Sequence, residues 1–184
     1  CAVLYKLRFN FGFSTTDSWD HKSGSYEHPT LHKSFAYFHR YKYFQQIPGL
    51  GFIAKFFYNR ASFILNKLLL RSDVFKSSKL LWLLPFFINS DYNLKLIFII
   101  RDFESYSKSR FFRFGQDFDI IEDNYIRSYK HMIFLSTIYD SLILDFSDLV
   151  NGYNDECILK ISEFLDKSPD DVSFALTASI NYHS

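Results

Sequence analysis

Apolar positions recur every three to four residues in several stretches of the chain, the pattern of amphipathic helices. The stretches predicted to be helical are residues 2–7, 30–42, 52–70, 80–88, 105–114, 123–138 and 155–165. Ile47-Pro48-Gly49 separates two of them, because proline and glycine both interrupt helices. A final helix is predicted after Ser168, which can cap it, while Pro169 fits its first turn.

Continuous apolar runs rich in β-branched residues predict the strands. Lys95–Arg101 is the clearest case, and its apolar run is typical of a strand buried on both faces in a parallel sheet. Ser141–Phe146 is predicted to be a second buried strand and Asp73–Lys76 a short one. Strands that alternate with helices predict an α/β fold with a mainly parallel sheet. Because no repeat or linker divides the chain, we expect a single domain over residues 1–184.

Composition narrows the functional classes. The 184 residues are 48% hydrophobic, enough for a packed core, and the net charge of +1 gives no basic field for nucleic acid. Pro85 interrupts the apolar run Leu80–Ile88, which is too short to cross a bilayer. No signal peptide is visible, so we expect a cytoplasmic protein with neither a membrane nor a nucleic acid as partner. The oligomeric state stays open.

The sequence offers no metal site or disulfide framework. Cys1 and Cys157 are the two cysteines, and we interpret them as a terminal thiol and a packing residue. No cluster of His, Cys and Asp has the spacing of metal ligands, so no metal is expected.

The end of the strand at residues 95–101 is the strongest candidate for a binding site. Ligands of open α/β sheets lie at the carboxyl ends of strands, and the guanidinium of Arg101 would stand there with a geometry suited to phosphate. Ser109 follows on the next predicted helix and could add a hydroxyl. The structural alternative is an ion pair of Arg101 with Asp102 or Glu104.

Five segments, in this order, resemble the sulfotransferases that use 3′-phosphoadenosine 5′-phosphosulfate (PAPS). They are residues 24–27, 76–85, 101–109, 144–149 and 158–165. The resemblance covers nearly the whole chain. It implies a three-layer P-loop-type α/β fold, with a mainly parallel sheet and helices on both faces. It also implies that PAPS is the donor and that Arg101 and Ser109 bind its 3′-phosphate.

The activity implied by the resemblance is transfer of a sulfuryl group to a hydroxyl of a carbohydrate or small molecule. Lys76 matches a lysine that contacts the bridging oxygen of the donor, with a solvated strand-end lysine as the alternative. Ser78 replaces the usual histidine and cannot act as the base, so Glu27 is the first candidate for this role, ahead of His28 and His32.

The chain departs from the family pattern in several places. Phe103, Ser77-Ser78 and Ser147 replace family residues, and the glycine-rich phosphosulfate loop has no counterpart. Residues 1–7 resemble the helix that follows that loop. We therefore expect a domain truncated at its N-terminus, lacking its first strand and phosphate loop, and an inactive fragment whose full-length form is the enzyme.

Two other functions stay open at this point. A non-catalytic sulfotransferase-like protein that binds a nucleotide or a partner would explain the altered serines. A P-loop nucleotide kinase would share the broad architecture. Residues 33–44 mix cations with aromatic side chains and could face an anionic sugar or nucleic acid, but the pattern favours a helix with one core face and one solvated face.

Overall fold

The computed structural model of the protein describes residues 2–10, 29–71, 73–74, 76, 80–84, 93–150 and 154–180. In these residues the chain is a mixed α/β protein, mostly helical, with one two-stranded parallel sheet. The α/β class and the parallel pairing predicted from the sequence are confirmed. Contacts divide the chain into two compact units, Cys1–Phe87 with Phe174–Ser184, and Ile88–Ser173.

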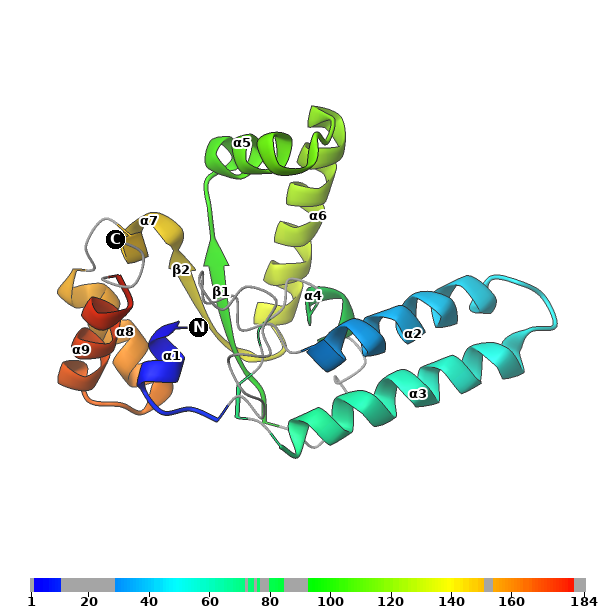
Figure 1. The fold of residues 1–184 in the computed structure, drawn as a ribbon, viewed down its shortest axis with the longest axis horizontal. Helices are drawn as coiled ribbons and strands as arrows, with labels where there is room; N and C mark the ends of the chain where they lie inside the picture. The colour runs from blue at the N-terminus through cyan, green and yellow to red at the C-terminus, as the bar shows by residue number, and fades with distance from the viewer. Residues whose placement is uncertain are drawn as a thin grey trace. The chain divides into compact units, whose positions relative to one another are not determined.

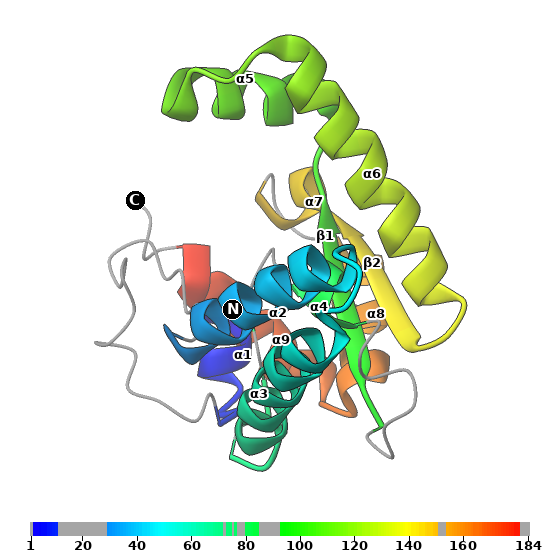
Figure 2. The ribbon, with the colours of Figure 1, turned by 90° about the vertical axis from the view of Figure 1, so that its right-hand side faces the viewer.

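The first unit is built on a hairpin of two long helices, α2 (Pro29–Gln45) and α3 (Gly51–Leu69), which lie side by side in Figures 1 and 2. The predicted break at residues 47–49 is confirmed. Gly49 adopts a φ of +82° in the turn, a conformation that glycine reaches without the steric penalty of a side chain.

Small and apolar side chains fill the seam between α2 and α3. Those that are buried include Leu31, Ser34, Phe38, Ala54, Ala61 and Leu65. The hydroxyl of Ser34 is fully buried and donates to the carbonyl of Ala61 at 3.1 Å. The polar group is thus satisfied across the seam, as buried polar groups require.

Two shorter helices, α1 (Ala2–Lys6) and α4 (Leu80–Leu83), complete the described helices of this unit apart from the end of α9. The backbone N–H and side-chain amide of Asn10 bond Asp73 and the carbonyl of Arg71. Of the strand predicted at residues 73–76, the described part forms an isolated bridge at Lys76. The predictions for residues 11–28 concern residues outside the described part of the chain. Of the helix predicted at 80–88, the structure describes residues 80–84 only.

The second unit contains a parallel strand–helix–helix–strand arrangement: β1 (Lys95–Ile100), α5 (Phe103–Phe114), α6 (Phe118–Ser136) and β2 (Asp140–Asp145). Figure 2 shows the two strands side by side with α6 returning the chain from the end of α5 to the start of β2. The register pairs Lys95 with Asp140 and Ile100 with Asp145. Both strands therefore end at the same edge of the sheet.

Three helices follow β2: α7 (Phe146–Val150), α8 (Asp155–Leu165) and α9 (Pro169–Ile180), of which α7 and α8 contact β2. The bounds predicted for α8 are confirmed. The predicted cap is also confirmed, since the hydroxyl oxygen of Ser168 accepts from the N–H of Asp171 at 3.1 Å. The sequence did not predict α7.

Two expectations about this unit are wrong. β1 is half-buried rather than buried on both faces, and Ile99 is 53% exposed, because the helices that pack on this sheet among the described residues, α7 and α8, contact mainly β2. The helix predicted at residues 123–138 begins earlier, at Phe118, because Ile121 is fully buried and belongs to its apolar face.

Candidate functional site at the carboxyl edge of the sheet

Arg101 and Phe146 directly follow the paired last residues of β1 and β2. The guanidinium carbon of Arg101 lies 3.9 Å from the centroid of the Phe146 ring, within the range of a cation–π contact. This contact joins two of the segments that resemble the sulfotransferases, residues 101–109 and 144–149. It also fixes one face of the guanidinium against an aromatic ring, which leaves the N–H groups around its edge to meet a ligand.

Tyr125 of α6 holds the backbone at the same place. Its hydroxyl donates to the carbonyl of Arg101 at 2.9 Å. Its ring lies 5.2 Å from that of Phe103 and 5.3 Å from that of Tyr106, centroid to centroid. Burial raises the pKa of the Tyr125 hydroxyl, so the group stays protonated and remains a donor.

Both carboxylates at this edge are held by their own local turns. Asp102 accepts from the N–H of Ser105 at 2.7 Å and caps α5, which lowers its pKa. Asp145 accepts from the hydroxyl and the N–H of Ser147, each at 2.7 Å, and its pKa is lowered by these bonds. We call Arg101, Asp102, Tyr125, Asp145 and Phe146 the carboxyl-edge cluster.

The alternative of a strand-end ion pair fails for Arg101 in the described part of the chain. Asp102 is the N-cap of α5, and Glu104 instead pairs with Lys108 at 2.5 Å, one turn along the helix. No carboxylate of the described residues forms a salt bridge with Arg101. Arg101 therefore has no ion-pair partner among the described residues, although its charge lies close enough to Asp102 to contribute to the lowered pKa of that carboxyl.

Ser109 lies on α5 and is half-buried. Its spacing places it on the same side of the helix as Ser105 and the capping residue Asp102. Arg110 donates to the hydroxyl of Tyr106 at 3.3 Å, and Arg113 is exposed in the last turn of α5. The structure thus puts Arg101 and Ser109 in one unit, Arg101 directly after β1 and Ser109 within α5.

The structure describes one of the two residues predicted to be catalytic. Lys76 is exposed at its bridge position in the first unit. Glu27 lies outside the described residues, as do His28 and Ser77-Ser78. His32 falls within α2. Their proposed roles stay predictions.

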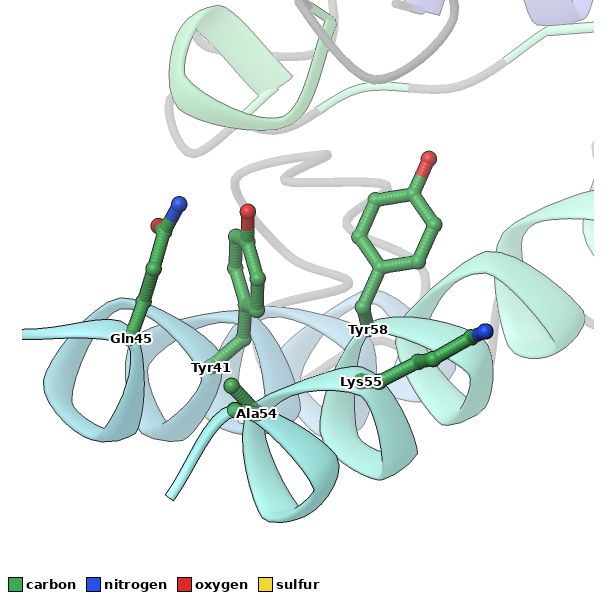
Figure 3. Close-up of a pocket in the computed structure, with 6 residues that line it drawn as sticks. Tyr41, Gln45, Ala54, Lys55 and Tyr58 are labelled. Carbon is green, nitrogen blue, oxygen red and sulfur yellow. The ribbon is translucent and has the colours of Figure 1, made fainter. Parts of the chain in front are cut away.

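A shallow depression of about 330 Å³ lies on the hairpin of α2 and α3. Figure 3 shows the side chains of Tyr41, Gln45 and Tyr58 pointing to the same side, while Lys55 extends sideways. On the same two helices, Lys42 lies over the Phe38 ring at 4.9 Å and Arg40 over the Phe57 ring at 5.7 Å. The helix with one buried and one solvated face, favoured by the sequence for residues 33–44, is confirmed.

A metal site and a membrane-spanning helix are both absent from the described ranges. No group of three His, Cys, Asp or Glu side chains gathers there as metal ligands would. No helix among these residues combines the length and apolar character needed to span a bilayer. The thiol of Cys157 is buried, which raises its pKa, and it packs as the sequence analysis expected.

Comparison with known proteins finds no matching family model, no similar curated protein and no similar solved structure. The carboxyl-edge cluster is therefore the main observation that bears on function. Sequence reasoning found Arg101 and Asp102 but missed the contributions of Tyr125 and Phe146. The signal for Phe146 is its position directly after the second predicted strand, which a parallel pairing brings next to Arg101.

Proposed function

We propose that this chain is a sulfotransferase-like domain whose carboxyl-edge cluster binds the 3′-phosphate of PAPS. The observation that carries the proposal is the position of Arg101, stacked on Phe146 at the carboxyl edge of two parallel strands, with no carboxylate paired to it among the described residues. A phosphate is the ligand that best matches an oriented guanidinium at this place in an α/β fold.

The proposed fold extends the observed sheet. β1 and β2 would be two strands of the mainly parallel, three-layer P-loop-type sheet that the resemblance implies, with helices on both faces. Ser109 would add its hydroxyl to the same phosphate, as the sequence resemblance implies.

The proposed reaction is an in-line sulfuryl transfer. A hydroxyl oxygen of a carbohydrate or small-molecule acceptor attacks the sulfur of PAPS and forms a new S–O bond. The S–O bond to the phosphate breaks, and adenosine 3′,5′-bisphosphate leaves with the electron pair. The acceptor's proton passes to a base. The sequence resemblance implies Glu27 for this role, and it implies Lys76 for stabilising charge on the bridging oxygen.

Nucleotide binding provides the direct test. Calorimetry would compare adenosine 3′,5′-bisphosphate with AMP, which lacks the 3′-phosphate, on wild type, Arg101→Ala and Lys130→Ala. We expect weak binding that favours the bisphosphate, and Arg101→Ala should abolish that preference, a change of about tenfold or more for lost charge-assisted hydrogen bonds. Lys130 is an exposed cation of α6 and serves as the charge-matched control.

Three results would overturn the proposal: no binding of the bisphosphate at millimolar concentration, an equal preference for AMP, or an Arg101→Ala variant that keeps its discrimination. Activity is tested separately, by transfer of labelled sulfate from PAPS to polysaccharide acceptors, using the chain extended at its N-terminus by a phosphosulfate loop. Glu27→Gln should lower turnover there and leave donor affinity nearly unchanged.

One observation favours a second candidate, a non-catalytic nucleotide-binding protein. Ser147 stands where the family has glutamate, and its hydroxyl donates to Asp145 within a turn. A polar group engaged in this way supports the local backbone rather than a reaction. The extended chain would then bind the bisphosphate through Arg101 but transfer no sulfate.

A further inference from the structure

Four phenylalanines are exposed where α5 turns into α6. Phe111, Phe112, Phe114 and Phe118 are 47%, 81%, 62% and 55% exposed. The ring of Phe111 lies 5.8 Å from those of both Phe112 and Phe118, so these rings form one surface rather than scattered positions. We call these four residues the aromatic corner. Soluble monomers seldom expose so dense an apolar group without using it for contact.

Charges of both signs surround the aromatic corner. Arg110 and Arg113 lie at the end of α5, and Asp117 and Asp119 lie at the start of α6. None of the four forms an ion pair within the described residues. Elsewhere on the same helices, Lys108 pairs with Glu104 and Arg127 pairs with Asp123.

The aromatic corner and its surroundings carry both apolar rings and charges of both signs, so this surface is complementary to a second copy of itself. We propose that the aromatic corner is a self-association surface, on which a second copy of this chain docks about a two-fold axis. A two-fold axis sets the same patch of both copies face to face, so phenylalanine meets phenylalanine. The same rotation can set the arginines of one α5 opposite the aspartates of the partner's α6. Arg110 already donates to the hydroxyl of Tyr106 and lies over the Phe114 ring. None of the four charges has an ion-pair partner among the described residues, so docking would neutralise them between copies.

The equal numbers of positive and negative charges at the aromatic corner favour a second copy of the chain over a lipid surface as its binding partner. Peripheral membrane helices combine exposed aromatic residues with an excess of Lys and Arg, which attracts anionic headgroups. At the aromatic corner, Asp117 and Asp119 offset Arg110 and Arg113. An anionic bilayer would therefore gain no net attraction and would bring the two carboxylates close to its own negative charge.

The oligomeric state of the intact chain tests the surface. Sedimentation velocity over a range of concentrations should show wild type in a monomer–dimer equilibrium. Phe112→Ser should weaken the dimer about tenfold or more, because Phe112 is the most exposed ring of the aromatic corner. Phe52→Ser is the matched control, since Phe52 is 73% exposed on α3, and it should leave the dimer unchanged. Circular dichroism confirms that each variant is folded.

The charges give a second, independent arm. Arg113→Glu makes the corner acidic and Asp119→Arg makes it basic, so each variant alone should be monomeric because like charges then face each other. An equimolar mixture of the two should restore a heterodimer, since opposite charges meet again across the axis. Loss of dimer in the singles with recovery in the mixture is expected only if the charges pair between copies.

Several outcomes would overturn the proposal. One is a wild type that stays monomeric at high concentration. Another is a dimer that Phe112→Ser and both charge variants leave intact, which would place the interface elsewhere. Flotation with vesicles of phosphatidylcholine and phosphatidylserine forms the last arm: a monomer that floats with these vesicles, and loses this with Phe112→Ser, would make a bilayer the occupant.

Discussion

The guanidinium of Arg101 lies over the ring of Phe146, 3.9 Å from its centroid, although the two residues are far apart in the sequence. The parallel pairing of β1 with β2 brings them together. Ile100 and Asp145 are paired across the two strands and are the last residues of β1 and β2, so Arg101 and Phe146 follow them at the same edge of the sheet. The contact orients a side chain that otherwise has many rotamers. An oriented guanidinium loses less conformational entropy when a phosphate binds to it.

Replacement of Phe146 should therefore weaken the proposed phosphate binding without removing the charge. Phe146→Leu keeps an apolar side chain but removes the aromatic face, and a cation–π contact is worth about 0.5–2 kcal/mol. We expect affinity for adenosine 3′,5′-bisphosphate to fall by a factor of about 2 to 30, as measured by calorimetry. Phe146→Tyr should retain wild-type affinity. Equal losses in both variants would mean that packing, rather than the aromatic face, matters at this position.

The carboxyl-edge cluster shows what a single sequence can and cannot reveal. The unbroken apolar run Leu96–Ile100 predicts a strand, so the location of Arg101 at a strand end follows from local pattern alone. The contact with Phe146 depends on the pairing and register of two distant strands, which no local pattern records. Tyr125 of α6 contributes a hydrogen bond to the carbonyl of Arg101. This bond depends on how α6 packs near the end of β1, which the sequence pattern alone does not show.

The hydrogen bond from Tyr125 to the carbonyl of Arg101 should contribute to stability. Tyr125→Phe removes the donor and leaves a partly buried carbonyl with one partner fewer, which should cost about 0.5–1.5 kcal/mol. Urea denaturation monitored by circular dichroism measures the loss. Tyr129→Phe is the control, because Tyr129 is a 39% exposed neighbour on the same helix. If both variants unfold at the same urea concentration as wild type, the bond contributes nothing.

Asp102 should make the start of α5 sensitive to acid. The hydrogen bonds from Ser105 lower the pKa of Asp102 below its ordinary value of 3.8. Stability from a carboxylate with a lowered pKa is fully present above the ordinary value and is lost as the pH falls through the lowered one. The amide resonance of Ser105, followed by NMR, should move with a midpoint below 3.8. In Asp102→Asn the cap persists but cannot titrate, so this shift should vanish; a midpoint above 3.8 would contradict the assignment.

The boundaries of α8 and α6 also differ in how far the local sequence predicts them. Asn154 caps α8 through the N–H of Cys157 at 2.8 Å, and the amphipathic pattern of residues 155–165 located this helix correctly. Asp117 precedes α6 without such a side-chain bond. The sequence places the start of this helix at residue 123 because Glu122 and Asp123 have the acidic character that favours a first helical turn. The burial of Ile121, a tertiary effect, extends α6 back to Phe118.

Gly115 ends α5 and should resist substitution for conformational reasons alone. Its φ is +59°, and no atom lies within 4 Å of where a β-carbon would be, so the cost of an added methyl is backbone strain rather than collision. Gly115→Ala should lower the free energy of unfolding by about 1 kcal/mol, and Gly115→Asn by less. Gly51→Ala, also in open space but without a positive φ, should be neutral or stabilising. Thermal and urea unfolding compare the three; equal effects at both glycines would contradict the explanation.

The hairpin of α2 and α3 depends on small residues at its seam. Ser34, Ala54 and Ala61 are 0%, 3% and 4% exposed, and the hydroxyl of Ser34 reaches the carbonyl of Ala61 at 3.1 Å. Such a contact requires the two helix backbones to approach closely. Ser34→Ala removes one buried hydrogen bond but keeps the approach, so it should cost about 1 kcal/mol.

Ser34→Leu makes the sharper comparison at this seam. Its larger side chain cannot fit without separating α2 from α3, and overpacking of this kind costs about 1–3 kcal/mol in addition to the lost bond. Urea denaturation should therefore rank wild type above Ser34→Ala and Ser34→Ala above Ser34→Leu. A leucine variant as stable as the alanine variant would mean that the helices can separate at little cost. The close packing at Ser34 and Ala61 would then not be what determines their spacing.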